Sequence, residues 1–294
     1  KDARIRLLLS LSANLKVTDW LTLQARGNLD YSADKLRQKF YASTATALCG
    51  MNGRYIEMDY QETQMYGDVM AMVKKQLNDF TLDVAIGGSI NDRITNSTRI
   101  DSKNASLKYA NVFNLANIVM SSSASIDQKI DAHYQLQSLF ATAQIGYKEG
   151  VFLDLTARND WSSTLAYTKY EKKGFFYPSV GVSFLPDKWV KMPEWVSFSK
   201  LRGAYSIVGN GVPPFITYPV SYVTAGGEIL ASDAAPFAEM KPEMTHSVEL
   251  GMEWKFLQHR LGLNLTYYRT DTYEQFFKLP ALAGDKYALS LIHI

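Results

Sequence analysis

Residues 134–161 alternate apolar and polar side chains in two runs joined by a tight turn at 148–150. The apolar phase of the first run is Leu139, Ala141, Ala143, Ile145 and Tyr147, and Phe140 is the one apolar residue in its polar phase. The second run sets Val151, Leu153, Leu155 and Ala157 against Asp154, Thr156, Arg158 and Asp160. Strand side chains alternate with period two, so this pattern predicts a β-hairpin with one apolar and one charged face. A face so rich in charge fits a water-filled interior, and the apolar face then fits lipid.

The same alternation recurs along most of the chain and predicts about ten strands. They are expected at 5–15, 20–31, 61–77, 80–94, 134–147, 151–161, 176–184, 201–207, 244–256 and 261–267. Short turns at 17–19, 78–79, 148–150 and 258–260 alternate with the long segments 32–56, 99–129 and 210–243. Residues 186–199 form a further connection, and 288–294 starts no clear strand. One tight end and one elaborate end are typical of outer-membrane barrels, whereas a soluble sandwich has turns every 8–12 residues and no long side.

The expected fold is therefore all-β: part of an antiparallel up-and-down transmembrane β-barrel, with residues 1–294 as one partial barrel domain. Aromatic residues make up 13% of the chain and support this interpretation, because amphipathic rings collect at both membrane interfaces. Beside the short turns lie Trp20, Tyr147, Phe152, Trp254 and Phe256. Toward the long segments lie Tyr31, Tyr267 and Tyr268.

Composition excludes several other classes. A net charge of +2 from 31 basic and 29 acidic residues gives no basic stripe, so no nucleic acid partner is expected. The single Cys49 excludes an internal disulfide and a cysteine-based zinc site. No stretch reaches the roughly 18 uninterrupted apolar residues of a membrane-spanning helix, but transmembrane strands need only about 9–11 residues.

Motifs in the third quarter of the chain resemble the SusC/RagA family of TonB-dependent outer-membrane transporters. These motifs are RNDWSS at 158–163, FYPSVGVSF at 176–184, KLRGAY at 200–205 and VGN at 208–210. The similarity continues through KPEMT at 241–245, ELG at 249–251, RL at 260–261 and YY at 267–268, with looser matches at DWL 19–21 and NDF 78–80. Each motif alone is weak, but their order and spacing are specific, and the resemblance covers nearly the whole chain.

The resemblance implies a 22-stranded barrel filled by an N-terminal plug, which imports glycans or peptides too large for passive pores. It implies as partners a SusD-like surface lipoprotein, the TonB–ExbB–ExbD energy-coupling complex and outer-membrane lipid, and it implies location in the cell outer membrane of a Gram-negative-type cell. No plug, TonB box or signal peptide is found in the sequence, so the chain is expected to be a middle part of the barrel.

The charged phase provides the candidate functional residues. Arg158, Asp160, Arg202, Asp154 and Glu249 are expected to face the lumen, together with Asp83 and Glu253. They either seat the plug and line the substrate route or form a ladder of cross-strand pairs that hydrates the wall. In the loops, Tyr218, Tyr222 and Phe237 either stack on sugar rings or pack the loop itself.

No catalytic residue, metal ligand or cofactor site is predicted. The histidines His133, His246, His259 and His293 are scattered and have no metal-binding spacing, and His246 is expected at the membrane interface. Three alternatives to an energy-coupled transporter stay open: a passive porin, a barrel-wall enzyme such as a lipase, and a soluble or secreted adhesin-like β protein. The enzyme would need an adjacent Ser and His on the outer face at the rim, which the alternation does not provide.

Overall fold

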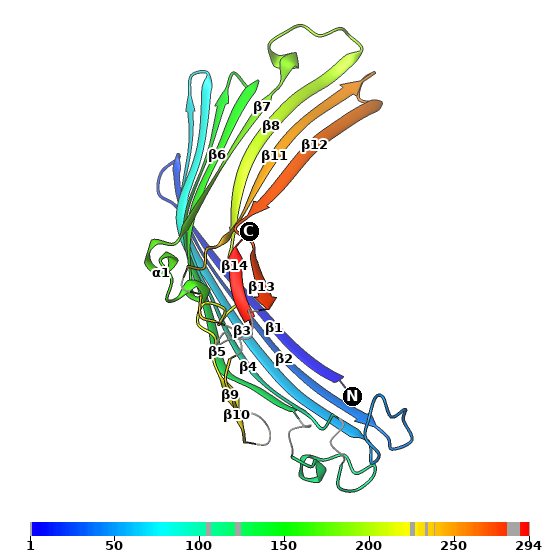
Figure 1. The fold of residues 1–294 in the computed structure, drawn as a ribbon. Helices are drawn as coiled ribbons and strands as arrows, with labels where there is room; N and C mark the ends of the chain where they lie inside the picture. Colours follow the sequence, from blue (N-terminus) through cyan, green and yellow to red (C-terminus); the bar gives the residue numbers. More distant parts are fainter. Residues whose placement is uncertain are drawn as a thin grey trace.

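The computed structural model describes residues 2–103, 107–120, 125–223, 227–232, 235–237, 239–280 and 289–293. Ten long strands form one antiparallel sheet in the order β1-β2-β3-β4-β5-β6-β7-β8-β11-β12 (Figure 1). The strands are β1 Asp2–Lys16, β2 Leu21–Phe40, β3 Arg54–Leu77, β4 Phe80–Asp101, β5 Ser125–Tyr147, β6 Val151–Ser162, β7 Phe175–Phe184, β8 Val196–Asn210, β11 Glu243–Phe256 and β12 Leu261–Tyr273. Each strand pairs with its neighbours in the chain, which confirms the predicted all-β, up-and-down meander.

The remaining elements are short. Two small antiparallel pairs are β9 Tyr222–Val223 with β10 Ile229–Leu230, and β13 Phe276–Pro280 with β14 Leu289–His293. The helical turns are η1 Leu115–Asn117, η2 Ser163–Leu165, α1 Tyr170–Lys173 and η3 Pro186–Lys188. The prediction that 288–294 starts no strand is wrong, because β14 pairs with β13. The alternation of side chains did not predict β13 as a strand.

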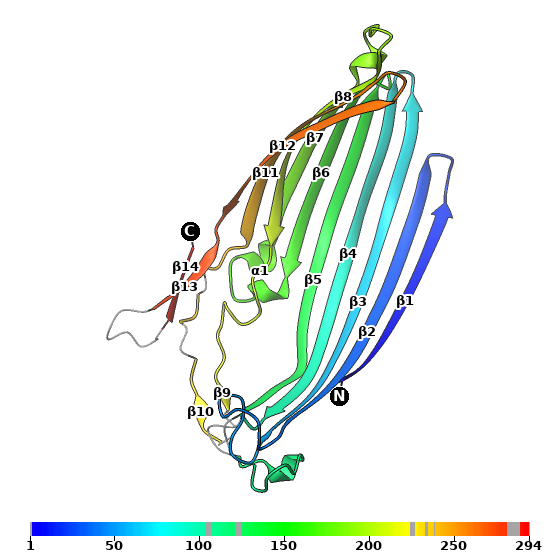
Figure 2. The same cartoon turned by 90° about the vertical axis from the view of Figure 1, so that its right-hand side faces the viewer.

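The sheet is a curved, open wall whose edges are β1 and β12 (Figures 1 and 2). The short turns after β1, β3, β5 and β11 lie at one end of the wall, and the long connections after β2 and β4 lie at the other. The predicted asymmetry between a tight end and an elaborate end is thus confirmed. At the tight end Asn78 adopts φ 51, a left-handed conformation that asparagine tolerates better than most residues.

Strands at the elaborate end run farther than the alternation predicts. The segments 32–56 and 99–129 were expected as loops, but β2 continues to Phe40, β3 starts at Arg54 and β5 starts at Ser125. In these extensions ion pairs take the place of the apolar phase: Arg37 contacts Glu57 at 2.7 Å and Lys35 contacts Asp59 at 3.4 Å. A strand with charges on its outward phase loses the apolar period that identifies it in the sequence.

Hydrophobic cores among the described residues form where the connections pack against the ends of strands. One cluster contains Tyr55, Leu107 and Ile118, with Ile100 and Phe113 packed against it. The second joins Leu165, Phe175, Val212 and Met240, with further aromatic side chains around it. The long connections are therefore packed against the ends of the strands that they join.

Candidate functional site

The charged residues predicted on one phase do share one face of the sheet. Directly paired residues of neighbouring strands point to the same side. In the register of the sheet, Asp154 pairs with Gln144 on β5 and Gly181 on β7, Gly181 pairs with Ala204, and Ala204 pairs with Glu249. Asp154 and Glu249 therefore lie in one cross-strand row of a continuous polar face.

Arg158 and Asp160 come together in a buried cluster on this face. The Asp160 carboxylate, with a residue exposure of 4%, accepts from Arg158 Nε at 2.8 Å and from the Tyr177 hydroxyl. The Arg158 guanidinium also donates to Ser138 Oγ at 2.9 Å. Position i+2 on one strand brings Arg158 and Asp160 to the same face, and the register with β5 and β7 adds Ser138 and Tyr177.

A second cluster is centred on Arg202. Its guanidinium forms an ion pair with Glu249 at 3.1 Å and donates to Thr266 Oγ1 at 2.9 Å, so it bridges β8 to β11 and β12. The side chain lies over Gly251, where an added Cβ would clash with it. Asp154, Arg202 and Glu249 line a shallow groove of about 260 Å³ whose floor includes Gly181 and Ala204. The five predicted residues thus form two clusters rather than one site.

The polar face also contains an ion pair that is not among the residues predicted from the sequence. Arg26 on β2 bonds to both carboxylate oxygens of Asp68 on β3, at 3.1 and 3.0 Å. The Asp68 side chain is fully buried. Both residues stand in the polar phase, so the signal was present, but their pairing depends on the β2–β3 register.

Large side chains on the polar face cover glycines of the neighbouring strand. Phe140, the exception to the alternation, pairs with Gly87, and an added Cβ there would lie 2.8 Å from the ring. Phe152 covers Gly146 in the same way. The interface role predicted for Phe152 and Tyr268 is therefore wrong: both lie on the polar face, Tyr268 opposite Glu249. Aromatic cover of this kind stabilises a strand that lacks a side chain.

The opposite face is apolar, and every strand of the wall contributes exposed side chains to it. Its members include Leu11, Leu23, Val69, Ile86, Leu139, Leu155, Val182, Leu201, Leu250 and Leu265. Monomeric soluble proteins rarely expose contiguous apolar patches beyond a few hundred Å². No helix within the described residues is long and apolar enough to cross a membrane.

Aromatic rings gather where the apolar face meets the short turns. Tyr147 packs against Phe80 at 4.7 Å and against Trp189 at 5.6 Å between ring centroids. Trp195 stacks on Phe256 at 5.6 Å. At the elaborate end, the predicted interface residue His246 accepts or donates a 2.7 Å hydrogen bond with the Tyr205 hydroxyl. Rings thus mark both margins of the apolar face, as an interfacial belt requires.

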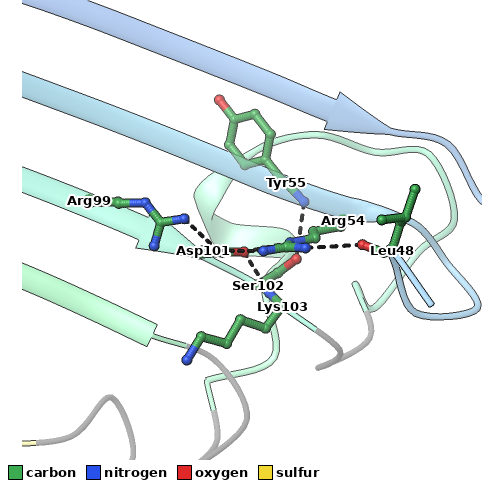
Figure 3. Close-up of polar contacts among 7 residues, drawn as sticks. All are labelled: Leu48, Arg54, Tyr55, Arg99, Asp101, Ser102 and Lys103. Carbon is green, nitrogen blue, oxygen red and sulfur yellow. Dashed lines mark hydrogen bonds and ion pairs between the residues drawn. The ribbon is translucent and has the colours of Figure 1, made fainter. Parts of the chain in front are cut away.

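The connections after β2 and β4 are joined by a buried carboxylate, Asp101 (Figure 3). Arg54 donates to both of its oxygens, at 2.8 and 2.7 Å, and Arg99 and the Lys103 N–H each donate at 2.8 Å. Arg54 also reaches the Leu48 carbonyl at 3.1 Å. We call this group, with the cluster around Tyr55, the loop hub.

The loop hub is expected to open in acid. Burial raises the pKa of Asp101, but the hydrogen bonds from Arg54, the Lys103 N–H and Arg99, with the guanidinium charge, outweigh burial and lower it from 3.8 to about 2. Because the folded pKa lies below the unfolded value, the stabilisation is complete above pH 3.8 and is lost as the pH falls toward 2. The amide protection factors of residues 41–53 and 107–120, which compare exchange with the intrinsic rate at each pH, should stay high down to that range and then fall. In Asp101→Asn, protection should be low at neutral pH already. Loss of protection well above the carboxyl range in the unsubstituted protein would contradict this account.

The loop aromatics have separate environments. Phe237 packs against the cluster of Leu165 and Met240. Tyr218 is exposed and lies 5.4 Å from the ring of Tyr167, whereas the Tyr222 side chain lies outside the described residues. Tyr218 is thus exposed, whereas Phe237 is partly buried against the loop itself.

No group of His, Cys, Asp and Glu with metal-binding geometry occurs in the part of the chain that the structure describes. A curved antiparallel wall with one polar and one exposed apolar face defines a membrane β-barrel segment. Residues 1–287 match the family model described as TonB dependent receptor-like, beta-barrel, and the chain belongs to this family of outer-membrane transport proteins, as the sequence motifs indicated.

Solved structures show the same fold. The RagAB peptide importer in the "open-open" state matches with a TM-score of 0.79 and 17% identity over 100% of this chain and 32% of that chain. The siderophore receptor PiuA from Acinetobacter baumannii matches with a TM-score of 0.57 and 13% identity, over 98% of this chain and 42% of that one. The chain thus spans about a third of the length of the RagAB chain it matches. The comparison with curated proteins gives no match.

Proposed function

We propose that residues 1–294 form part of the barrel wall of a SusC/RagA-type transporter that imports glycan or peptide oligomers across the outer membrane. The observation that carries the proposal is the two-faced wall: a continuous exposed apolar face on all ten strands, with a charged face behind it. In this arrangement the apolar face contacts lipid and the charged face lines the interior of the barrel.

On the interior side, Arg158, Asp160, Arg202, Asp154 and Glu249 are lumen-facing. The Arg158–Asp160 cluster is internally neutralised and its carboxylate is buried, so it acts as structural cross-bracing of the wall. The groove between Asp154 and Glu249 has a small-residue floor and remains open. This groove is the better candidate for contacts with a plug or a passing substrate.

The family and the resemblance of the motifs support energy coupling through TonB–ExbB–ExbD and capture of substrate by a SusD-like lipoprotein. The RagAB match describes a peptide importer, which supports a peptide among the possible cargoes. A passive porin of the same wall structure would need neither TonB nor a lipoprotein.

The test is uptake by cells that carry the full-length gene. Deletion of the gene, of tonB or of the neighbouring lipoprotein gene should each abolish growth on one class of oligomer, peptide or glycan, while growth on the free monomers continues. Growth that depends on the gene but not on tonB would identify a passive porin and refute the energy-coupled mechanism.

A further inference from the structure

The apolar face contains a wide, open groove where small residues replace large ones. Across β3 and β4, Gly67 and Gly88 leave the sheet backbone uncovered between Val69, Ile90 and Leu139. The groove has a volume of about 1100 Å³, at the upper end of the roughly 300–1,000 Å³ of small-ligand pockets. It lies on the same phase as the exposed leucines and valines, so it opens directly into the apolar face.

The connection between β6 and β7 closes one side of this groove. Because β5 extends far beyond the end of β6, this connection lies against the flank of β5, and Figure 1 shows α1 beside the ends of β6 and β7. Ser163 Oγ accepts from the Gln135 N–H at 3.0 Å, and the Trp161 indole N–H donates to the Lys172 carbonyl at 2.9 Å. These bonds fix a wall that Trp161, Ala166 and Glu171 line.

A chain of polar side chains forms the rim of the groove toward the elaborate end. Gln137 Nε2 donates to Gln135 Oε1 at 2.8 Å, and Gln135 Nε2 donates to Asp92 at 2.8 Å. His133 contacts the same carboxylate at 2.7 Å. Along β5 toward the elaborate end, Leu139 is therefore the last apolar residue on this face, and the residues that follow on the same face are amides and charged groups. This change marks the level of lipid headgroups.

We propose that this groove binds one acyl chain of a phospholipid, with the headgroup at the amides of Gln135 and Gln137. The assignment rests on the proposed function, since it requires the apolar face to be in lipid. The groove is continuous with that face and has an apolar floor, which suits an acyl chain. Its rim supplies amides that both donate and accept hydrogen bonds, which suits a headgroup. The groove therefore passes from apolar to polar in the same order as a lipid does from its chain to its headgroup. The fixed wall of the β6–β7 connection distinguishes it from the open face, where lipids exchange freely.

The experiment uses the full-length protein in vesicles of phosphatidylethanolamine that contain a phosphatidylethanolamine with a photoactivatable diazirine in its acyl chain. Cross-links mapped by mass spectrometry should concentrate in residues 135–139 and 166–171, saturate at one per protein and be competed by unlabelled lipid. Gly67→Leu should lower this labelling several-fold, because it fills the floor of the groove. An added Cβ at Gly67 lies 3.8 Å from the nearest atom, so the substitution leaves the backbone unstrained.

The matched control is Gly203→Leu, which lies on the same apolar face but outside the groove, between Val182 and Leu250, where an added Cβ lies 3.4 Å from the nearest atom. This variant should label like the unsubstituted protein. Ala166→Trp, which narrows the groove from the connection without changing a strand, should also lower labelling, and the shift of the band on unheated gels verifies folding of each variant. Labelling spread evenly over the apolar face, or equal in Gly67→Leu and Gly203→Leu, would overturn the proposal. Absence of labelling even around Leu153 would instead refute the proposed membrane orientation.

Discussion

Replacing Leu153 by Arg is expected to lower the free energy of unfolding of the full-length protein by about 2–4 kcal/mol. Leu153 stands on the apolar face, where its direct partners are Ile145 on β5 and Val182 on β7. A guanidinium at this position loses its hydration within hydrocarbon and has no acidic cross-strand partner. Reversible unfolding in urea, with the protein refolded into lipid vesicles, measures the effect.

Thr156→Arg provides the matched control on the same strand. Thr156 stands on the polar face between Thr142 and Ser179, and its side chain is exposed. The new charge stays hydrated in the interior of the barrel, and a change within about 0.5 kcal/mol is expected. Equal losses in Leu153→Arg and Thr156→Arg would show that the two faces are not in different solvents.

Asp160→Ala is expected to destabilise the wall by about 1.5–3 kcal/mol, the usual range for hydrogen bonds to a charged group. Without the carboxylate, the Arg158 guanidinium loses its 2.8 Å partner and the Tyr177 hydroxyl loses its acceptor. The same urea unfolding measures this loss.

Asp154→Ala, on the same strand and the same face, should cost only about 1 kcal/mol. Its carboxylate is partly exposed and accepts one hydrogen bond, from Gln144 Nε2 at 2.7 Å. An equal loss of unfolding free energy in Asp154→Ala and Asp160→Ala would contradict the view that burial of the Arg158–Asp160 cluster distinguishes the two carboxylates.

Hairpins at the tight end of the wall could be predicted from the sequence because two independent signals agree there. The alternation fixes which residues share a face, and the short turn fixes the register. The two signals placed Ile145 and Leu153 on the apolar face of one hairpin, and in the structure these residues pair directly. At the elaborate end the strands leave the apolar environment, and pairs such as Arg37–Glu57 stabilise them without leaving any apolar period.

The sequence predicted which face of the sheet each candidate residue occupies, but not which residues it contacts. Arg158 and Asp160 share a face because they are two positions apart, but the role of Tyr177 in burying Asp160 depends on the register with β7. The loop hub has no periodic signal, since Arg54 and Asp101 meet only when β3 and β4 pair along their whole length. The groove on the apolar face is formed by missing side chains, and a glycine such as Gly67 within a strand can equally mark a bulge or a bend of the sheet.

Spin-label accessibility at adjacent positions of β6 tests the central claim most directly. Cys49, the sole cysteine of residues 1–294, and any cysteine elsewhere in the full-length protein are replaced by Ser, and nitroxides are attached at Leu153→Cys and Asp154→Cys in that protein in vesicles. The label at 153 should collide mainly with oxygen, which concentrates in lipid, and the label at 154 mainly with a water-soluble nickel chelate. Equal collision with nickel at both positions, or the reverse order, would contradict a wall that separates hydrocarbon from water.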